Sequence, residues 1–291
     1  MSDPFENVDA ASPQMIDIIA AGLETRAADE DMLPVIDEYL GLLNLPEGGC
    51  IVDIGSGTGG ITRRIADRFP AASVMGLEPS AALTQKAIDL AGDRPNLTFS
   101  VGDGAALDLE DAVADVAILH TVLSHVSNPE PLIAEAVRIL RPGGTLVICD
   151  ADFSKAMMGI VPGDPLGSCC EAFVAGSVTD PWLAGKLKPL VGKAGVSVSH
   201  FSVRNRVVTS GMGALAWVRM SGARLVADGV IGQPLADAFT LGSELAATLP
   251  ADLEALTQQE LIDEEMAALE ADFLGFFQTF LLAFAGIALL V

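Results

Sequence analysis

The sequence predicts a doubly wound α/β fold, in which a parallel sheet carries helices on both faces. Short apolar runs alternate along the chain with helical segments, and the first run, Cys50 to Ile54, is broken only by Asp53, as expected for a strand covered on both sides. A glycine-rich turn, a helix over Thr58 to Phe69 and a second strand ending at Glu78 follow. This order of strand, turn, helix and strand is the building unit of such sheets.

Two helices are expected before the first strand. The first begins at Ser12-Pro13, with Ser12 as its cap, and carries apolar residues at helical spacing up to Leu23. The second covers about Asp31 to Leu43. Residues before Ser12 are polar and are expected to remain mobile until a partner or the substrate holds them. Both helices should lie over the mouth of the site that the glycine turn forms.

The turn after the first strand predicts a site for a nucleoside. A backbone that bends from strand to helix against a ligand has no room for a Cβ, and the free N–H groups at the helix start would face that ligand. Glu78, at the end of the neighbouring strand, can accept hydrogen bonds from both hydroxyls of a ribose. The pattern G-x-G-x-x-G at Gly55, Gly57 and Gly60 leaves a nicotinamide or flavin cofactor as an alternative.

The alternation continues beyond Glu78. Three more strands and three more helices are expected: a helix from Ser80 to Gly92, strands over Asn96 to Val101 and Val113 to Leu119, a helix capped by Asn128, a strand over Thr145 to Cys149 and a helix from Asp180 to Ala194. Residues 157–178 are rich in Gly and Pro and predict an irregular apolar lid, with core packing as the alternative. Residues 196–208 alternate and predict a sixth strand.

Four motifs of this chain resemble those of the class I S-adenosylmethionine-dependent methyltransferases. They are hydrophobic-Asp-x-Gly-x-Gly-Thr-Gly over residues 52–59, the acid Glu78, Gly102-Asp103 after the third strand, and LRPGGTLVICD over residues 140–150. Residues 120–144, HTVLSHVSNPEPLIAEAVRILRPGG, are similar to the branch with ubiquinone and menaquinone C-methyltransferases and many natural-product methyltransferases. The resemblance covers about residues 15–208.

The resemblance implies a seven-stranded sheet of order 3-2-1-4-5-7-6 with strand 7 antiparallel. The domains are then an N-terminal helical lid (1–45), a Rossmann-like cofactor-binding core (46–210), a helical cap inserted between strands 6 and 7 (211–271) and a final core strand (272–291). The uncharged tail, 273–291, is long enough for a membrane span. Its glycines and polar residues, and the lack of flanking basic residues, favour the strand.

The resemblance also implies S-adenosyl-L-methionine as cofactor and a set of residues that bind it: Arg26, Asp53, Gly55, Ser56, Gly57, Glu78, Pro79, Gly102, Asp103, Gly104 and His120. Two assignments have alternatives. Arg26 either clamps the cofactor carboxylate or pairs with a nearby surface acid. Asp103 either accepts from the adenine amino group or belongs to an ordinary Asp-Gly turn.

His120 and His125 are the candidate catalytic residues. They stand within six residues at the carboxyl end of the fourth strand, where ligands of open α/β sheets bind, and the chain has only three histidines. Histidine can take up the proton that methyl transfer to oxygen, nitrogen or an acidic carbon releases. The alternative is that His120 acts on the cofactor ammonium through its backbone carbonyl while its ring orders the loop.

Charge and cysteine content limit the partners. The chain has 39 acidic and 16 basic residues, which argues against nucleic acid or an anionic membrane and leaves a small molecule as the substrate. Four cysteines without C-x-x-C spacing predict neither a disulfide nor a metal framework. The N-terminal residues lack the basic and apolar character of a signal peptide, so we expect a cytoplasmic protein, and a homodimer stays open.

These observations predict an S-adenosylmethionine-dependent methyltransferase that acts on a small organic acceptor, apolar or aromatic and of the natural-product kind. One alternative is an enzyme that keeps the cofactor but catalyses a cyclisation or pericyclic step. Another is a non-catalytic binding protein, and a nicotinamide-dependent dehydrogenase is the third. The cofactor motifs alone do not separate the first two from a methyltransferase.

Overall fold

The computed structural model describes residues 3–30, 32–157, 165–204 and 226. Contacts divide the chain into two units, residues 1–155 with 176–206 and residues 156–175 with 207–291, and each is described by itself. Within the described residues, no helix combines the length and the apolar character that crossing a bilayer requires. The predicted final strand lies outside the described residues, as does the predicted cap apart from residue 226.

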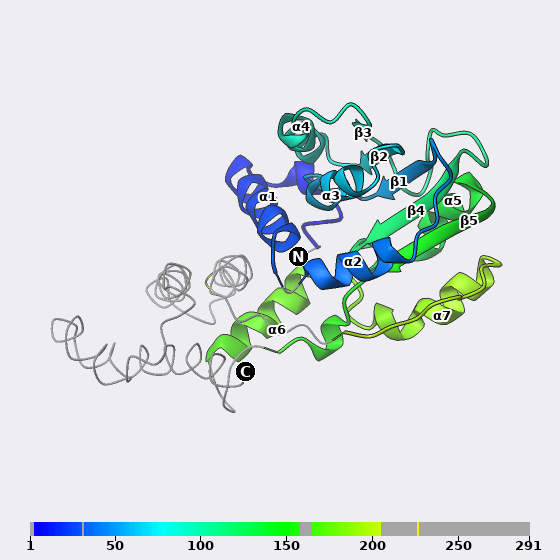
Figure 1. The fold of residues 1–291 in the computed structure, drawn as a ribbon. Helices are drawn as coiled ribbons and strands as arrows, with labels where there is room; N and C mark the ends of the chain where they lie inside the picture. The colour runs from blue at the N-terminus through cyan, green and yellow to red at the C-terminus, as the bar shows by residue number, and fades with distance from the viewer. Residues whose placement is uncertain (1–2, 31, 158–164, 205–225, 227–291) are drawn as a thin grey trace, which may run out of the picture. The chain divides into compact units, whose positions relative to one another are not determined.

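The first unit contains a sheet of five parallel strands, whose order is β3-β2-β1-β4-β5 (Figure 1). The strands are β1 (Cys50–Ile54), β2 (Ser73–Glu78), β3 (Leu97–Val101), β4 (Ala114–His120) and β5 (Leu140–Cys149). This order confirms the first five positions of the predicted sheet. Because the strands are parallel, their carboxyl ends share one edge, and β1 and β4 run side by side at its centre.

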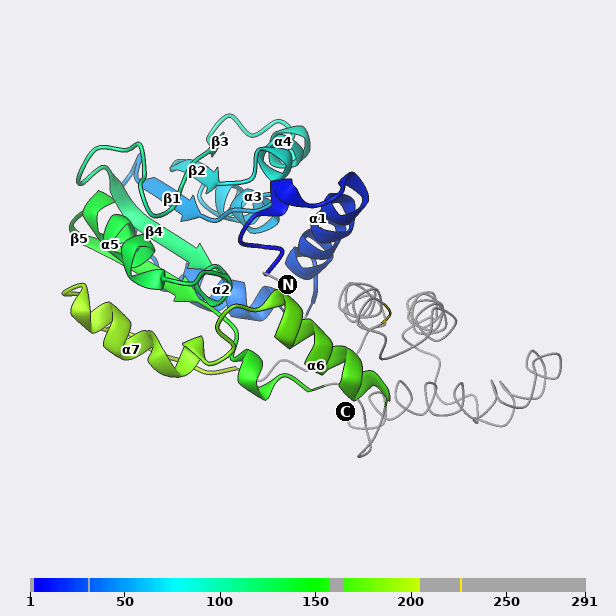
Figure 2. The ribbon, with the colours of Figure 1, turned by 180° about the vertical axis from the view of Figure 1, so that it is seen from behind.

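Alternate residues of β1 face two separate cores. Ile51 packs with α2 (Leu33–Gly41) and α3 (Gly60–Arg68), whereas Val52 and Ile54 pack with α5 (Pro129–Ile139) and α7 (Leu183–Lys193). Figures 1 and 2 show these helices from opposite sides of the sheet. The near-continuous apolar run of β1 therefore follows from burial on both faces, and the doubly wound architecture is confirmed.

Three predicted helix starts carry the side-chain caps that the sequence indicated. Ser12 Oγ accepts from Met15 N at the start of α1 (Pro13–Ala27), Ser80 Oγ from Leu83 N at α4 (Ala81–Leu90), and Asn128 Oδ1 from Glu130 N at α5. Proline follows the cap in α1 and α5, where its missing N–H costs nothing.

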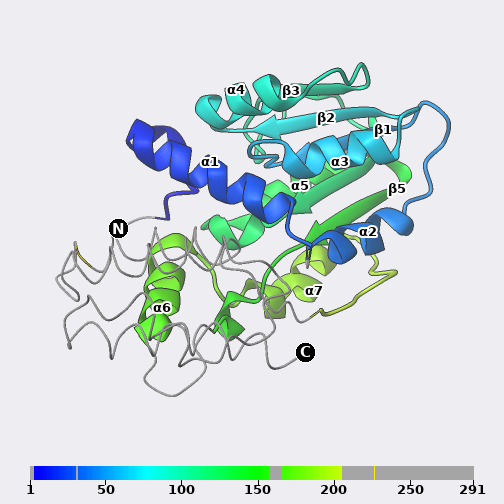
Figure 3. The ribbon, with the colours of Figure 1, turned by 60° about the vertical axis from the view of Figure 1, so that its left-hand side comes forward.

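Helix α1 lies against the glycine turn that follows β1 (Figure 3). A Cβ on Gly57 would stand 3.0 Å from Leu23 Cδ1, and a Cβ on Gly60 would stand 2.5 Å from Ala27 Cβ. The absence of side chains in the turn is thus needed for the close approach of α1. The helix covers the turn at the carboxyl edge of the sheet.

Two strand predictions differ from the structure. The fifth strand begins at Leu140 rather than Thr145, because Leu140 pairs with Ala114 of β4 and the pairing continues past an irregularity between Ala114 and Val116. Residues 196–204 form no strand, and 205–208 lie outside the described residues. Side chains of this segment contact helices instead: Arg204 Nε donates to Glu38 at 2.7 Å, and Lys188 lies over the Phe201 ring at 4.1 Å.

The prediction that residues 157–178 form irregular chain is wrong for residues 165–177. Helix α6 (Pro165–Ser177) occupies those positions and belongs mostly to the second unit. Three of the six glycines and prolines that suggested irregular chain stand before Pro165, and Pro165 itself is tolerated in a first turn. Residues 158–164 lie outside the described residues.

The N-terminal residues are bound to the fold rather than mobile. Val8, in the short 3₁₀ turn Val8–Ala10, is buried. Asp9 accepts from Ser80 Oγ at 2.5 Å and from Ala81 N at 2.8 Å, so it caps α4 from another part of the chain. The expectation of a mobile segment fails because its acidic side chains find the unpaired N–H groups that every helix start offers.

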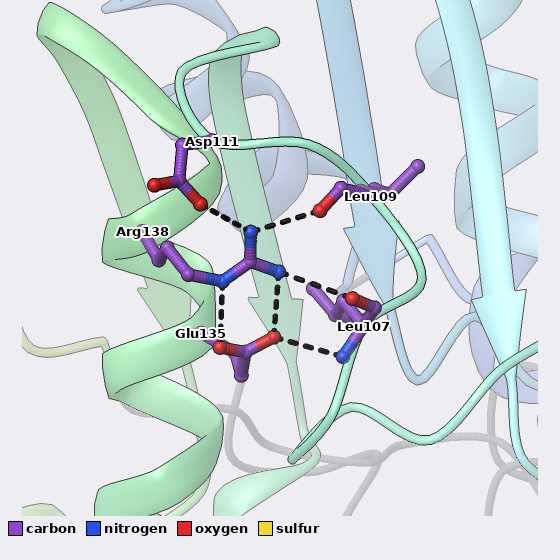
Figure 4. A network of polar contacts seen from close by, with 5 residues as sticks. All are labelled: Leu107, Leu109, Asp111, Glu135 and Arg138. Atoms are coloured by element: carbon purple, nitrogen blue, oxygen red, sulfur yellow. Dashed lines mark hydrogen bonds and ion pairs between the residues drawn. The ribbon is translucent and has the colours of Figure 1, made fainter.

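The loop between β3 and β4 is fastened to α5 by one arginine (Figure 4). Arg138 donates to the backbone oxygens of Leu107 at 3.1 Å and Leu109 at 2.8 Å, and pairs with Asp111 and Glu135. Glu135 in turn accepts from Leu107 N at 2.8 Å. These contacts hold in place the loop that begins with Gly102-Asp103.

Candidate functional site

The glycine turn uses most of its N–H groups within the protein. Gly55 N and Ser56 N both donate to Leu77 O, at 2.7 and 3.0 Å, and Gly57 N donates to Glu78 Oε2 at 2.9 Å. The free N–H groups were expected at the helix start, which these three residues precede, so that expectation stays a prediction. The turn itself folds back on the end of β2.

Gly55 shows why the turn needs glycine. Its φ is +78°, in the left-handed region, and a Cβ there would stand 2.6 Å from Val122 Cγ2. Val122 follows the end of β4, so this contact brings the β1 turn and the β4 loop together. A side chain at Gly55 would separate two segments of the predicted site.

Glu78 is a buried carboxylate at the end of β2, on this edge of the sheet. It is 7% exposed, and its Oε1 accepts from Ser80 N at 3.0 Å while Oε2 accepts from Gly57 N. Burial raises the pKa of this carboxyl, although the two backbone donors oppose the shift. Each oxygen keeps a lone pair for a further donor. The side chain is thus fixed and still able to accept two hydroxyl groups.

Asp53 is hydrogen-bonded inside the fold. It is 2% exposed, and Thr62 Oγ1 of α3 donates to its Oδ2 at 2.6 Å. Burial raises the pKa of Asp53 to about 6. The hydrogen bond of this predicted cofactor residue is therefore made with α3, and its charge depends on pH near neutrality.

Replacement of Asp53 by Asn is expected to show this buried charge. A raised pKa means that the folded state holds the proton more tightly than the unfolded state, so the contribution of Asp53 to stability is fully present at low pH and falls as pH rises through about 6. Between about pH 4.5 and about pH 7, the free energy of unfolding of Asp53→Asn should gain about 2 kcal/mol on that of the unsubstituted protein. Urea titrations at both pH values measure this change, and a constant difference between the two proteins would contradict it.

The segment after β3 contains the last group of predicted cofactor residues. Asp103 is exposed, and its Oδ1 accepts from Ala105 N at 2.9 Å, as in an ordinary Asp turn. Gly102 N donates to Glu78 O at 3.1 Å, which ties this segment to the end of β2. A Cβ on Gly104 would stand 2.9 Å from Ile54 Cγ2, so packing against β1 explains this glycine. Pro79 is exposed beside Glu78.

The surroundings of His120, at the end of β4, favour the neutral form of its ring. Its ring is 8% exposed, and Nδ1 lies 3.1 Å from the hydroxyl of Tyr39 on α2. Burial, together with the charge of Arg26, lowers the pKa of His120 to about 3. The other ring nitrogen, Nε2, is buried and has no partner among the described residues. A histidine in these surroundings takes up a proton poorly.

Arg26 reaches the same end of β4 from α1. Its Nη2 donates to Thr121 Oγ1 at 2.6 Å. Thr121 has a φ of +56°, an uncommon conformation for a residue other than glycine, and its N–H donates to Cys149 O at 2.7 Å. Arg26 is therefore directed at the carboxyl edge of the sheet.

His125 stands five residues after His120, in the 3₁₀ segment Leu123–His125. Its Nδ1 lies 2.9 Å from Asp3 Oδ2, and its ring is 4.6 Å from the Phe5 ring and 5.8 Å from the Phe153 ring. The two candidate histidines thus have different surroundings: His120 sits beside a cation and a hydroxyl, and His125 sits beside a carboxylate and two aromatic rings.

Sequence reasoning missed the polar contacts of three residues: Asp3, Tyr39 and Thr62. Tyr39 is the only tyrosine of the chain, and nothing in its local sequence indicates a contact with His120. Asp3 belonged to a segment predicted to be mobile. No local pattern marks Thr62, whose hydroxyl donates to Asp53 nine residues earlier.

Comparison with known proteins agrees with this geometry. Residues 52–148 match the family described as methyltransferase domain. The chain is 34% identical over 126 residues to trans-aconitate 2-methyltransferase of Variovorax paradoxus, an alignment that covers 43% of this chain and 47% of that protein. It is 32% identical over 121 residues to demethylmenaquinone methyltransferase of Tropheryma whipplei, covering 42% of this chain and 48% of that protein. The chain thus spans about half the length of the curated relatives it matches.

A solved structure extends the likeness in fold. Phosphoethanolamine N-methyltransferase 2 of Haemonchus contortus, in complex with S-adenosyl-L-methionine, superposes with a TM-score of 0.56 at 17% identity and covers 84% of this chain and 56% of that one. Fold, motifs and family match together assign residues 52–148 to the methyltransferase domains with the class I, S-adenosylmethionine-dependent fold.

The residues at the carboxyl edge fit an adenosyl cofactor. Ser56 Oγ and His120 Nε2, both in the predicted set, are buried polar atoms without a partner among the described residues. Such atoms are costly unless a ligand or water satisfies them. Each oxygen of Glu78 keeps a lone pair besides its backbone donor. Among the described residues, no cluster of His, Cys, Asp and Glu could hold a metal ion.

Proposed function

We propose that the protein transfers a methyl group from S-adenosyl-L-methionine to a small organic acceptor. The observation that carries this proposal is Glu78, a buried carboxylate fixed by Gly57 N and Ser80 N beside the glycine turn. This arrangement suits ribose hydroxyls. The family match over residues 52–148 supports the same activity.

The roles proposed for individual residues follow from their positions. Glu78 holds the ribose, Ser56 and Gly57 contribute the turn beside it, and Asp103 accepts from the adenine amino group with the oxygen that its own turn leaves open. Arg26 receives the carboxylate of the amino-acid end, and His120 donates from its unpartnered ring nitrogen. The bound cofactor supplies an electrophilic methyl group, and the protein's task is alignment in a site without water.

The acceptor is proposed to be apolar or aromatic. Phe5 and Phe153 face the His125 ring at the carboxyl edge and offer flat apolar surfaces. The relatives are named for acceptors as different as trans-aconitate and demethylmenaquinone, so the acceptor type rests on these rings. We also propose a cytoplasmic enzyme whose residues 1–45 form the lid, 46–210 the core, and 211–271 and 272–291 the cap and an added strand of the sheet.

Calorimetry followed by mass analysis tests the function. We expect S-adenosylhomocysteine to bind at micromolar concentration and NADH not to bind. With labelled S-adenosylmethionine and a panel of demethylmenaquinol, dimethylglycine and trans-aconitate, at least one product should gain a labelled methyl group. Binding of NADH alone would indicate a dehydrogenase, and a product of unchanged mass would indicate a cyclisation. Tight cofactor binding without any product would favour a binding protein.

A further inference from the structure

Asp3 is a fully engaged buried carboxylate, although it stands near the N-terminus. It is 8% exposed. Its Oδ1 accepts from Phe5 N at 2.9 Å, and its Oδ2 accepts from Thr179 N at 3.0 Å and Thr179 Oγ1 at 3.1 Å. The fourth contact is His125 Nδ1, 2.9 Å from Oδ2. Both oxygens therefore accept from backbone N–H groups, and a carboxylate held in this way acts toward His125 as an acceptor.

This contact fixes the tautomer of His125. Because an ionised Asp3 can only accept, His125 Nδ1 carries the hydrogen and Nε2 keeps its lone pair. Nε2 makes no hydrogen bond with the part of the chain that the structure describes, and the side chain keeps 10% of its surface open. The Phe5 and Phe153 rings, inclined to the imidazole by 51° and 67°, both contact it. The result is an oriented ring with one nitrogen available as a base.

Two other carboxylates close to the segment Leu123–His125 have partners other than His125. Asp150 Oδ2 accepts from Ser124 N at 3.2 Å, and Asp180 Oδ2 pairs with Lys186 at 2.6 Å. His120 sits beside Arg26 and accepts a proton poorly. Among the described residues, Asp3 is therefore the carboxylate that contacts a candidate base, and His125 is the histidine that it orients.

We propose that His125, oriented by Asp3, removes the proton from the acceptor atom that receives the methyl group. This inference rests on the proposed function and adds the acceptor class: a hydroxyl, an amine or an acidic carbon, each of which carries a proton, rather than a carboxylate, which is already ionised near neutral pH. His125 is the catalytic residue of this proposal, and Asp3 is a positioning residue.

The step balances without an oxidant or reductant. The bond from the acceptor atom to hydrogen breaks and its electron pair stays on that atom, which forms the bond to the methyl carbon. The bond from methyl carbon to sulfur breaks, and its electron pair goes to sulfur. The proton moves to His125 Nε2, so the positive charge passes from the sulfonium to an imidazolium beside Asp3. The nearby carboxylate stabilises that charge.

Nitrogen-15 NMR of the full chain tests the orientation without any acceptor. The chain has only three histidines, and the His125→Asn variant assigns the signal. We expect the wild-type ring to be protonated at Nδ1 and the Asp3→Asn variant to show a mixture of tautomers. Asp9→Asn is the matched control, because Asp9 also binds the N-terminal segment to the fold but does not touch the ring. A wild-type ring protonated at Nε2 would overturn the proposal.

Kinetics with the same panel test the chemistry. We expect transfer to demethylmenaquinol or dimethylglycine, a loss of about 100-fold or more in kcat for His125→Asn, and a loss of about 10-fold for Asp3→Asn that Asp3→Glu partly restores. S-adenosylhomocysteine should bind these variants as it binds wild type. Transfer confined to trans-aconitate, no transfer to any of the three, or full activity of His125→Asn would overturn the inference. Failure of wild type to bind S-adenosylhomocysteine would instead overturn the proposed function.

Discussion

Glu78→Gln is expected to weaken the binding of S-adenosylhomocysteine by about 100-fold, because hydrogen bonds to a charged group contribute about 1.5–3 kcal/mol each and the glutamine loses at least one of them. The contacts of Glu78 show why a glutamine cannot restore the lost hydrogen bond. Both oxygens of Glu78 already accept from backbone N–H groups, of Gly57 and of Ser80. An amide nitrogen in place of either oxygen would face a donor, so the side chain would have to turn away from its present position.

The measurement is calorimetric titration of the wild type and the variant with S-adenosylhomocysteine. Glu110→Gln is a suitable control, since Glu110 is an exposed glutamate in the loop after β3. That control should bind within about twofold of wild type. A Glu78→Gln variant that binds as tightly as the control would mean that the ribose does not reach Glu78, and the proposed placement of the cofactor would fail with it.

Local patterns in the sequence were sufficient for the central part of the fold. The run Cys50 to Ile54 became the middle strand because its residues face both cores, and Ser12, Ser80 and Asn128 cap helices as expected. These features depend on residues a few positions apart. The position of Glu78 was predictable for the same reason, since a parallel strand beside β1 must end near the turn that follows β1.

Features that depend on distant partners could not be predicted. Asp3 and His125 are 122 residues apart, and nothing in the local sequence of either indicates the other. The alternation over 196–204 indicated a strand, but a strand needs a neighbouring backbone to pair with, and here the side chains contact α2 and α7 instead. The hydrogen bonds from Gly55 N and Ser56 N to Leu77 O could not be predicted either, because the sequence does not show that this carbonyl lies within reach.

Acid should destabilise the fold through His120, and the His120→Asn variant should be less sensitive. The pKa of His120 is about 3 in the folded protein and near its ordinary value of about 6.5 in the unfolded chain. A lowered pKa means that the unfolded state binds more protons, so the contribution of His120 is fully present above about pH 6.5 and is lost as pH falls toward 3. This is the opposite sign to the contribution of Asp53.

Between about pH 7.5 and about pH 4, the stability of the wild type relative to His120→Asn should fall by about 3 kcal/mol. Asparagine is chosen because it can still bond to the Tyr39 hydroxyl, which contacts His120 Nδ1 at 3.1 Å, yet does not titrate. Urea titrations of the wild type and the variant at several pH values measure this difference. Parallel curves for wild type and His120→Asn would show that the ring is protonated as readily in the fold as in the unfolded chain, and that Arg26 and burial do not keep it neutral.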